Sequence, residues 1–223
     1  MNDHRKRRGF LRKEPTQPRS RALVEAVITA TNELGQTLVD EGEITIERIV
    51  RRAGVGLGSF YDYFADKDSL IGELVSRATQ QNFAALLGAL DAASPPTLEA
   101  AFTCVAECVA DIYLAHPTRT RLWIAGIGRL QLMGMVVGEC DRLARQLAVR
   151  AKRYLPQCTE DEIAEAMTAV CDANLGLVVS DLYRDRPRSR AMVVSAMTET
   201  AVALVARFRD EPEIPRTAAT ALP

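Results

Sequence analysis

The chain has 223 residues, of which 48% are hydrophobic and 26% are charged, and its formal net charge is −1. This length and composition fit a soluble globular protein of one or two domains with a sizeable core. No apolar run approaches the ~20 residues of a membrane span, and the basic N-terminus lacks the apolar segment of a secretory signal, so we expect a cytoplasmic protein with no membrane partner.

Side chains suited to metal binding or catalysis are scarce. His4 and His116 are the only histidines, and the five cysteines are scattered without a CxxC pair: Cys104, Cys108, Cys140, Cys158 and Cys171. The first two share a helix face, but their Cβ atoms would lie ~5–6 Å apart against the ~3.8 Å of a disulfide, so reduced core thiols are favoured over a redox pair. Without a phosphate loop, an HExxH motif or a Ser-His-Asp set, we expect no metal, no cofactor and no enzyme activity.

The positive charge is concentrated at the N-terminus. Residues 1–21 carry eight basic and two acidic side chains, a net charge of +6, whereas residues 22–70 have a net charge of −5. Such an arm can neutralise nucleic-acid phosphates or enter a minor groove, and a solubilising tail is the open alternative. Its basic residues are Arg5, Lys6, Arg7, Arg8, Arg12, Lys13, Arg19 and Arg21.

Local signals predict short helices after the arm. Ser20 can cap a helix that reaches about Asp40, and Thr45 can cap a second one that Gly54 ends in the left-handed conformation. A third helix can begin at Gly56 or Leu57.

Phe60 and Phe64 lie four residues apart, so we expect them to point inward and leave Ser59, Asp62 and Tyr63 outward or oblique. Asp66 is the expected N-cap of a longer fourth helix toward Leu90. A short helix, a glycine-containing corner and a second short helix form the helix-turn-helix pattern of DNA-binding proteins.

Three segments carry a family resemblance. Ala53-Gly54-Val55, Gly58-Ser59-Phe60-Tyr61-Asp62-Tyr63-Phe64 and Lys67-Asp68-Ser69-Leu70 closely resemble the DNA-binding signature of TetR-type (tetracycline-repressor-like) bacterial transcriptional regulators. With the first helix, the resemblance covers about a quarter of the chain, from Arg19 to Leu74.

The resemblance implies an all-α fold, in which an N-terminal three-helix helix-turn-helix DNA-binding domain precedes a helical ligand-binding and dimerisation domain. We place a basic flexible arm at 1–18, the DNA-binding domain at 19–68, the helical domain at 69–210 and a flexible tail at 211–223.

The same resemblance suggests which residues contact DNA. Gly56 stands where the family commonly has a hydroxyl cap, Leu57 where it often has a polar residue, and Asp62 where it often has histidine. The implied DNA-binding residues are Thr45, Arg48, Gly56, Leu57, Ser59, Tyr61, Asp62, Tyr63 and Lys67.

Everything beyond Thr97 reads as helical. Apolar stripes predict helices from Thr97 to His116, from Arg119 to Arg129 and from Met133 to Tyr154. A capping box at Thr159 to Glu162 opens a helix that extends to Leu182, and a final helix ends near Phe208 or Arg209.

The last two helices are apolar on more than one face, which favours a four-helix bundle with a second copy over a wider intrachain core; the resemblance also implies such a homodimer. The middle helices carry aromatic, Met and inward polar residues, and the resemblance places a pocket for a small hydrophobic effector there. Its expected residues are Phe102, Trp123, Met133, Met135, Tyr154, Asp172 and Asn174.

These features together predict a homodimeric regulator, most often a repressor in such a family, that binds a palindromic DNA operator as double-stranded DNA and releases it when a ligand binds. A helical dimeric scaffold or ligand-binding protein with lost or weak DNA binding is the alternative, because Leu57 and Asp62 are poor electrostatic choices for a DNA surface.

Overall fold

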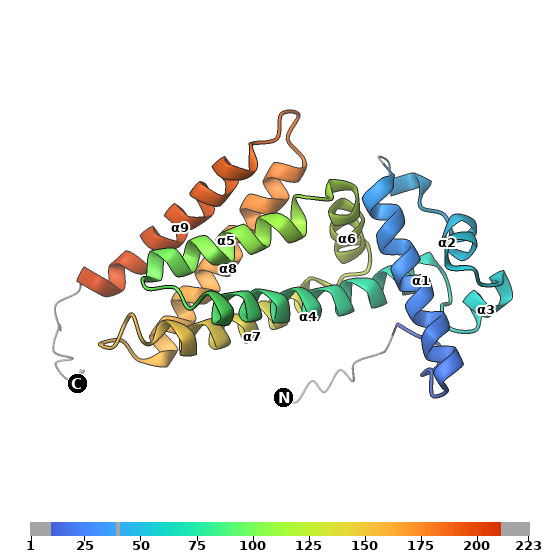
Figure 1. Cartoon of the computed structure of the whole chain (residues 1–223), viewed down its shortest axis with the longest axis horizontal. Coiled ribbons are helices and arrows are strands. Elements are labelled where there is room, and N and C mark those ends of the chain that lie inside the picture. Colours follow the sequence, from blue (N-terminus) through green and yellow to red (C-terminus); the bar gives the residue numbers. More distant parts are fainter. Residues whose placement is uncertain (1–9, 39–40, 211–223) are drawn as a thin grey trace, which may run out of the picture.

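The computed structural model describes residues 10–38 and 41–210, which form only helices and their connections. The predicted all-α fold is therefore confirmed. Figure 1 shows an elongated molecule in which α4 runs from a group of short helices at one end into a layered bundle at the other. The helices are α1 (Pro18–Thr37), η1 (Glu41–Glu43, a 3-10 turn), α2 (Ile46–Ala53), α3 (Leu57–Tyr61), α4 (Lys67–Ala93), α5 (Leu98–Tyr113), α6 (Pro117–Arg129), α7 (Met133–Ala151), α8 (Glu160–Leu182) and α9 (Arg190–Asp210).

We call the first group, α1 to α3 with the start of α4, the head. Its core is mostly apolar, with Phe60 and Phe64 both completely buried and their ring centroids 5.2 Å apart. Leu122 and Trp123 of α6 belong to the same buried cluster, although they lie far along the chain. The head core is therefore closed by a helix from the second half of the sequence, which no local pattern indicates.

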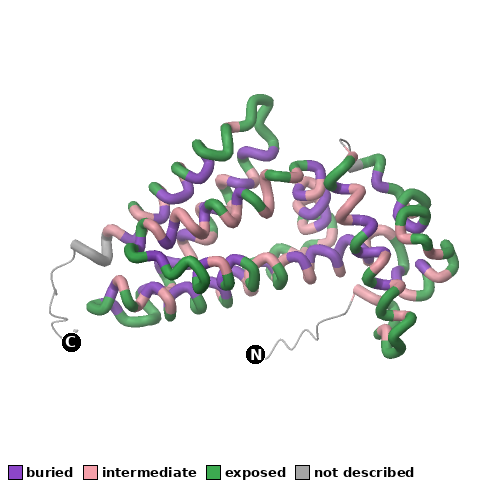
Figure 2. The backbone as a smooth tube through the Cα atoms, viewed as in Figure 1, coloured by how far each residue is buried: buried purple, intermediate pink, exposed green. Residues whose placement is uncertain are grey.

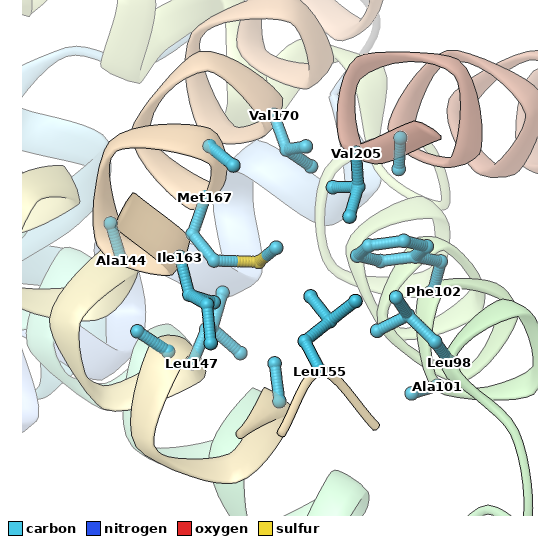
Figure 3. Close-up of a cluster of buried hydrophobic side chains, with 14 of the residues drawn as sticks. Leu98, Ala101, Phe102, Ala144, Leu147, Leu155, Ile163, Met167, Val170 and Val205 are labelled. Atoms are coloured by element: carbon cyan, nitrogen blue, oxygen red, sulfur yellow. The ribbon is translucent and has the colours of Figure 1, made fainter. Parts of the chain in front are cut away.

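We call α5 and α7 to α9, with the second half of α4, the body, and α6 contributes residues to both regions. Their facing stripes build a second core around Leu147, Leu155, Ile163 and Met167. Figure 3 shows these side chains meeting Phe102 of α5 in the middle of the bundle. Burial of such side chains is worth about 1.5–3 kcal/mol each, so this core holds the body helices together.

Three of the four predicted N-cap residues, Thr45, Asp66 and Thr159, are confirmed. Asp66 accepts a hydrogen bond from the Ser69 N–H at 2.7 Å, and Thr159 accepts one from the Glu162 N–H at 3.3 Å. The Glu162 carboxylate accepts the Thr159 N–H in return, at 2.8 Å, which completes the capping box. These caps satisfy backbone donors that have no partner inside the helix.

Several predicted boundaries are wrong; for example, α6 begins at Pro117 instead of Arg119, and α5 ends at Tyr113 instead of His116. The first helix begins at Pro18 instead of after Ser20, because proline is well suited to a first helical position and Ser20 accepts a hydrogen bond from the Gln17 N–H from inside the first turn. The helix from Met133 ends at Ala151, so Tyr154 lies in the following turn. The predicted tail at 211–223 and residues 1–9 of the predicted arm lie outside the described residues.

Helix α8 is, by length and composition, apolar enough to cross a membrane. In the fold, it packs against α7 and α9. Core helices of globular proteins can be as long and as apolar as this one. Figure 2 shows buried residues alternating with exposed and half-buried ones along the bundle helices, so each presents a second face away from the body core.

Candidate DNA-binding surface and effector cavity

The corner between α2 and α3 has the tight geometry that its sequence predicts. Gly54 adopts a left-handed conformation, with φ of 67°, and Val55 donates its N–H to the Val50 carbonyl at 3.0 Å. Thr45 caps α2 by accepting the Arg48 N–H at 3.3 Å. These bonds fix two short helices at an angle, which neither would keep alone because isolated helices of this length are unstable.

Helix α3 is held by its inner side and open on its outer side. Phe60 anchors it in the head core, while Leu57 and Tyr61 are 45% and 41% exposed. Asp62 ends the helix and is exposed, and Ser59 is half-buried. A short exposed helix carried on a rigid core is the arrangement that a major groove accepts.

Other predicted DNA residues surround this helix. Thr45, Arg48 and Gly56 are exposed, and Lys67 lies half-buried at the first position of α4. Arg48 forms an exposed ion pair with Glu43 at 2.8 Å, a weak interaction that a phosphate could replace.

Tyr63 takes the oblique position that the helical spacing allows, because its ring is half-buried against the head core with Lys13 Nζ above it at 4.8 Å from the centroid.

The body contains a cavity of about 350 Å³ lined by residues of α4 to α9. Most of the lining is apolar, including Leu86, Phe102 and Met167. Near the ends of α4 and α7, the lining becomes charged, where Arg150 holds Asp91 through two hydrogen bonds of 2.7 and 2.6 Å. A cavity of this size, with apolar walls and few polar groups, is the usual form of a small-molecule site.

Three polar atoms of the cavity residues are buried without a hydrogen-bond partner in the described part of the chain. They are the acceptor Oδ1 of Asn174 and two donors, Nε1 of Trp123 and Nδ2 of Asn82. Asn174 and Trp123 are only 9% and 7% exposed. Since an unpaired buried polar group costs about 1–3 kcal/mol, these atoms mark places where a ligand with complementary polar groups would gain hydrogen bonds.

Two cysteines also line the cavity, from α7 and α8. Burial raises the pKa of Cys140 to about 11 and that of Cys171 to about 12, and nearby carboxylates add to the shift. Both thiols therefore stay protonated near neutral pH and act as apolar wall groups instead of nucleophiles. Burial likewise raises the pKa of Tyr113, so its hydroxyl remains a donor at the same wall.

Four of the seven predicted ligand residues, Phe102, Trp123, Tyr154 and Asn174, line the cavity. Met133 is exposed at the start of α7, Met135 packs against the head core, and Asp172 faces away on the exposed side of α8. These three do not line it, because spacing along a helix gives the face of a residue but not the helix's position beside its neighbours.

Sequence reasoning missed Asn82, Tyr113, Cys140 and Cys171 as cavity residues. Asn82 could have been found, because it follows Ala78 and precedes Leu86 at four-residue spacing on the inward stripe of α4.

Helix α6 connects the cavity to the head. Trp123 lines the cavity and also packs in the head core. A Cβ atom at Gly126 would lie 2.3 Å from Ile71 Cγ2 of α4, and one at Gly35 of α1 would lie 3.0 Å from Arg119 Cβ, so α6 packs closely on both helices. Arg129 adds an ion pair with Asp68 at 2.8 Å. The cavity wall and the head therefore share one rigid element.

An exposed α3 on a fixed two-helix corner defines a helix-turn-helix DNA-binding protein. Residues 42–74 match the sequence model of the family described as bacterial regulatory proteins, tetR family. The chain is 25% identical over 186 residues to the HTH-type transcriptional regulator BetI of Escherichia coli O45:K1, across 81% of this chain and 93% of BetI.

Solved structures share the fold over most of the chain. A TetR transcriptional regulator from Rhodococcus sp. RHA1 superposes with a TM-score of 0.60 at 20% identity, covering 85% of this chain and 98% of that one. The multidrug binding protein EbrR, solved with imidazole, has a TM-score of 0.51 at 17% identity, covering 82% and 95%. The chain thus resembles the TetR-family regulators in the sequence of its helix-turn-helix segment and shares their fold.

Proposed function

We propose that this regulator is a homodimeric repressor that binds a palindromic operator through two copies of α3 and releases it when a small hydrophobic ligand fills the body cavity. The observation that carries the proposal is Trp123, which belongs to both the cavity wall and the head core. A ligand that changes the packing of Trp123 must also change how α6 supports the head.

The dimer is supported by the outer faces of α8 and α9. Small residues recur there, with Gly176 and Ala203 exposed and Ala173 and Ala196 half-buried. A Cβ atom at Gly176 would meet none of the described residues of its own chain within 4 Å, so this face is open among them. Small side chains allow two helices to approach closely, and a twofold pairing of these faces would build a four-helix bundle.

The proposed effector is an apolar compound with at least one donor and one acceptor, which would pair with Asn174 and Trp123. The known ligand complex of EbrR supports this use of the fold. The thiols in the cavity wall are protonated and therefore uncharged. At the charged end of the cavity, Asp91 and Arg150 already pair with each other, so neither part favours a charged ligand. A cytoplasmic location follows for a protein that meets both operator and effector.

Operator release tests the proposal directly. Purified protein is first titrated onto DNA from its own upstream region, and compounds that quench Trp123 fluorescence are then added. Linkage requires that, if a ligand weakens DNA binding by a given factor, DNA weaken the binding of that ligand by the same factor. A ligand that quenches Trp123 but leaves operator affinity unchanged would exclude this mechanism. Failure of the upstream region and of selected genomic fragments to bind would favour the scaffold alternative.

Dimerisation has its own test. Gly176→Arg places a charge on the proposed helix crossing, whereas Gly134→Arg places one at an exposed glycine at the start of α7 that also has nothing within 4 Å. Sedimentation should show dimers for the wild type and Gly134→Arg, and monomers or aggregates for Gly176→Arg. A wild-type monomer that binds a palindrome tightly would contradict the bundle.

A further inference from the structure

Residues 10–13, which we call the strap, dock on the head beside α3. The Phe10 ring fills a notch at Gly72 of α4, where an added Cβ would lie only 2.3 Å from Phe10 Cδ1. Leu11 packs against the head core. The predicted arm of 1–18 is therefore not free over this part, and its docking depends on the absence of a side chain at position 72.

The strap also supplies hydrogen-bond donors to the end of α3. The Arg12 N–H donates to the Tyr63 carbonyl at 2.8 Å, and its guanidinium donates to the Tyr61 carbonyl at 3.4 Å. Carbonyls at the C-terminal end of a helix lack partners within it, and a helix of five residues has little stability of its own. The strap therefore fixes the backbone that carries Tyr61 and Tyr63.

Charge is the second consequence of this docking. Residues 56–65 contain no basic side chain and one acidic one, Asp62. Lys13 places its Nζ 3.8 Å from Asp62 Oδ1, and both side chains are more than half exposed. An exposed pair at this distance contributes little to stability, so the Lys13 side chain can turn toward a phosphate. Its backbone stays in place because Phe10 and the Arg12 N–H anchor the strap.

We infer that the strap is part of the DNA-binding surface: Phe10 and Arg12 position the end of α3, and Arg12 and Lys13 contact DNA phosphates there, offsetting the negative charge of Asp62. This inference rests on the proposed DNA binding. It assigns a function to the arm that is separate from residues 1–9 and explains how a recognition segment with Asp62 remains compatible with DNA.

The experiment combines a structural and a functional measurement. Trypsin cleavage after Arg12 or Lys13 reports docking without DNA, and operator affinity is measured over a range of salt concentrations. Phe10→Ala and Gly72→Ala remove the anchor from opposite sides, and Lys13→Ala removes one cation. Arg145→Ala removes an exposed cation of α7 as a matched control.

We expect Phe10→Ala and Gly72→Ala to speed cleavage severalfold and to weaken operator binding about tenfold. Lys13→Ala should leave the melting temperature unchanged and make the slope of log K against log salt shallower by about one unit, whereas Arg145→Ala should change neither. Deletion of residues 1–9 should preserve slow cleavage at the strap.

Three results would overturn the inference. Unchanged cleavage in both anchor variants would show that the strap is not held by the notch. If the anchor variants were cleaved faster but operator affinity and salt slope stayed at their wild-type values in all variants, the strap would have a structural role only and would not contact DNA. A wild type that binds no DNA would refute the proposed function together with the phosphate contacts. The cleavage rates of the anchor variants would then still show whether the strap docks in the notch.

Discussion

The head and the body are packed in different ways. The head has a core in which Phe60 and Phe64 are completely buried and glycines at 72 and 126 admit neighbouring side chains. The body surrounds a cavity of about 350 Å³ whose wall includes Asn174 Oδ1, an acceptor without a partner among the described residues. The rigid region suits a surface that must match fixed DNA geometry, and the incompletely packed region suits a site that a ligand completes.

Truncation of one phenylalanine in each region gives the largest expected contrast. Phe60→Ala should lower the free energy of unfolding by about 3–5 kcal/mol, because the side chain is enclosed on all sides. Phe102→Ala should cost less, about 2 kcal/mol, since one side of its ring already faces the cavity and has fewer contacts to lose. Urea titrations measure both values, and equal losses would contradict the proposed difference in packing.

Glycines of α6 test how tightly the two regions are joined. Gly126→Ala should destabilise the protein by about 1–3 kcal/mol, because its Cβ would overlap the stiff Ile71 side chain of the head core. Gly128→Ala, two residues later on the same helix, has nothing within 4 Å and should stabilise by about 0.5–1 kcal/mol through helix propensity. Similar melting temperatures for the two variants would show that α6 and α4 are not closely packed.

Local signals made much of the head predictable. Thr45, Gly54 and Asp66 act on residues within four positions of themselves, and the structure confirms all three caps. The predicted start of α1 was wrong, since Pro18 and Ser20 both favour a helix start, and Ser20 accepts the Gln17 N–H from inside the first turn instead of preceding the helix. The strap was unpredictable because Phe10 and Gly72 are far apart in sequence, and neither indicates the other.

The cavity was predictable only in part. Asn174 was identified because a polar residue interrupted the inward stripe of α8, and the structure buries it at the cavity wall. Met133 was misplaced because its helical face is defined by spacing, whereas its distance from the cavity depends on where α7 begins relative to α4 and α8. Such offsets between helices are set by long-range packing.

Asn174 provides a test in which stability and ligand binding should change in opposite directions. Asn174→Leu replaces an unpaired buried acceptor and should raise the free energy of unfolding by about 1 kcal/mol, while weakening binding of any effector that donates to it. Asn32→Leu is the matched control, because Asn32 Oδ1 in α1 is also buried and unpaired but does not line the cavity. Calorimetry and Trp123 fluorescence should show stabilisation in both variants and weaker effector binding only in the first. Loss of stability in Asn174→Leu would imply that the amide has a structural partner.

The smallest expected effect comes from the cap that begins α4 at the edge of the head. Hydrogen bonds from the Ser69 backbone and hydroxyl lower the pKa of Asp66. A carboxylate whose pKa is lower in the folded state than in the unfolded state stabilises the protein at pH values above its unfolded pKa of about 3.9. This contribution is lost as the pH falls through the folded pKa. Asp66→Ala should therefore cost about 1 kcal/mol at pH 7, with the difference from wild type shrinking below pH 4. Asp66→Asn keeps an acceptor oxygen and should cost less at pH 7, without that pH dependence. Urea unfolding at pH 7 and pH 3 measures these differences, and a cost of Asp66→Ala that is the same at both values would show that the charged cap does not stabilise α4.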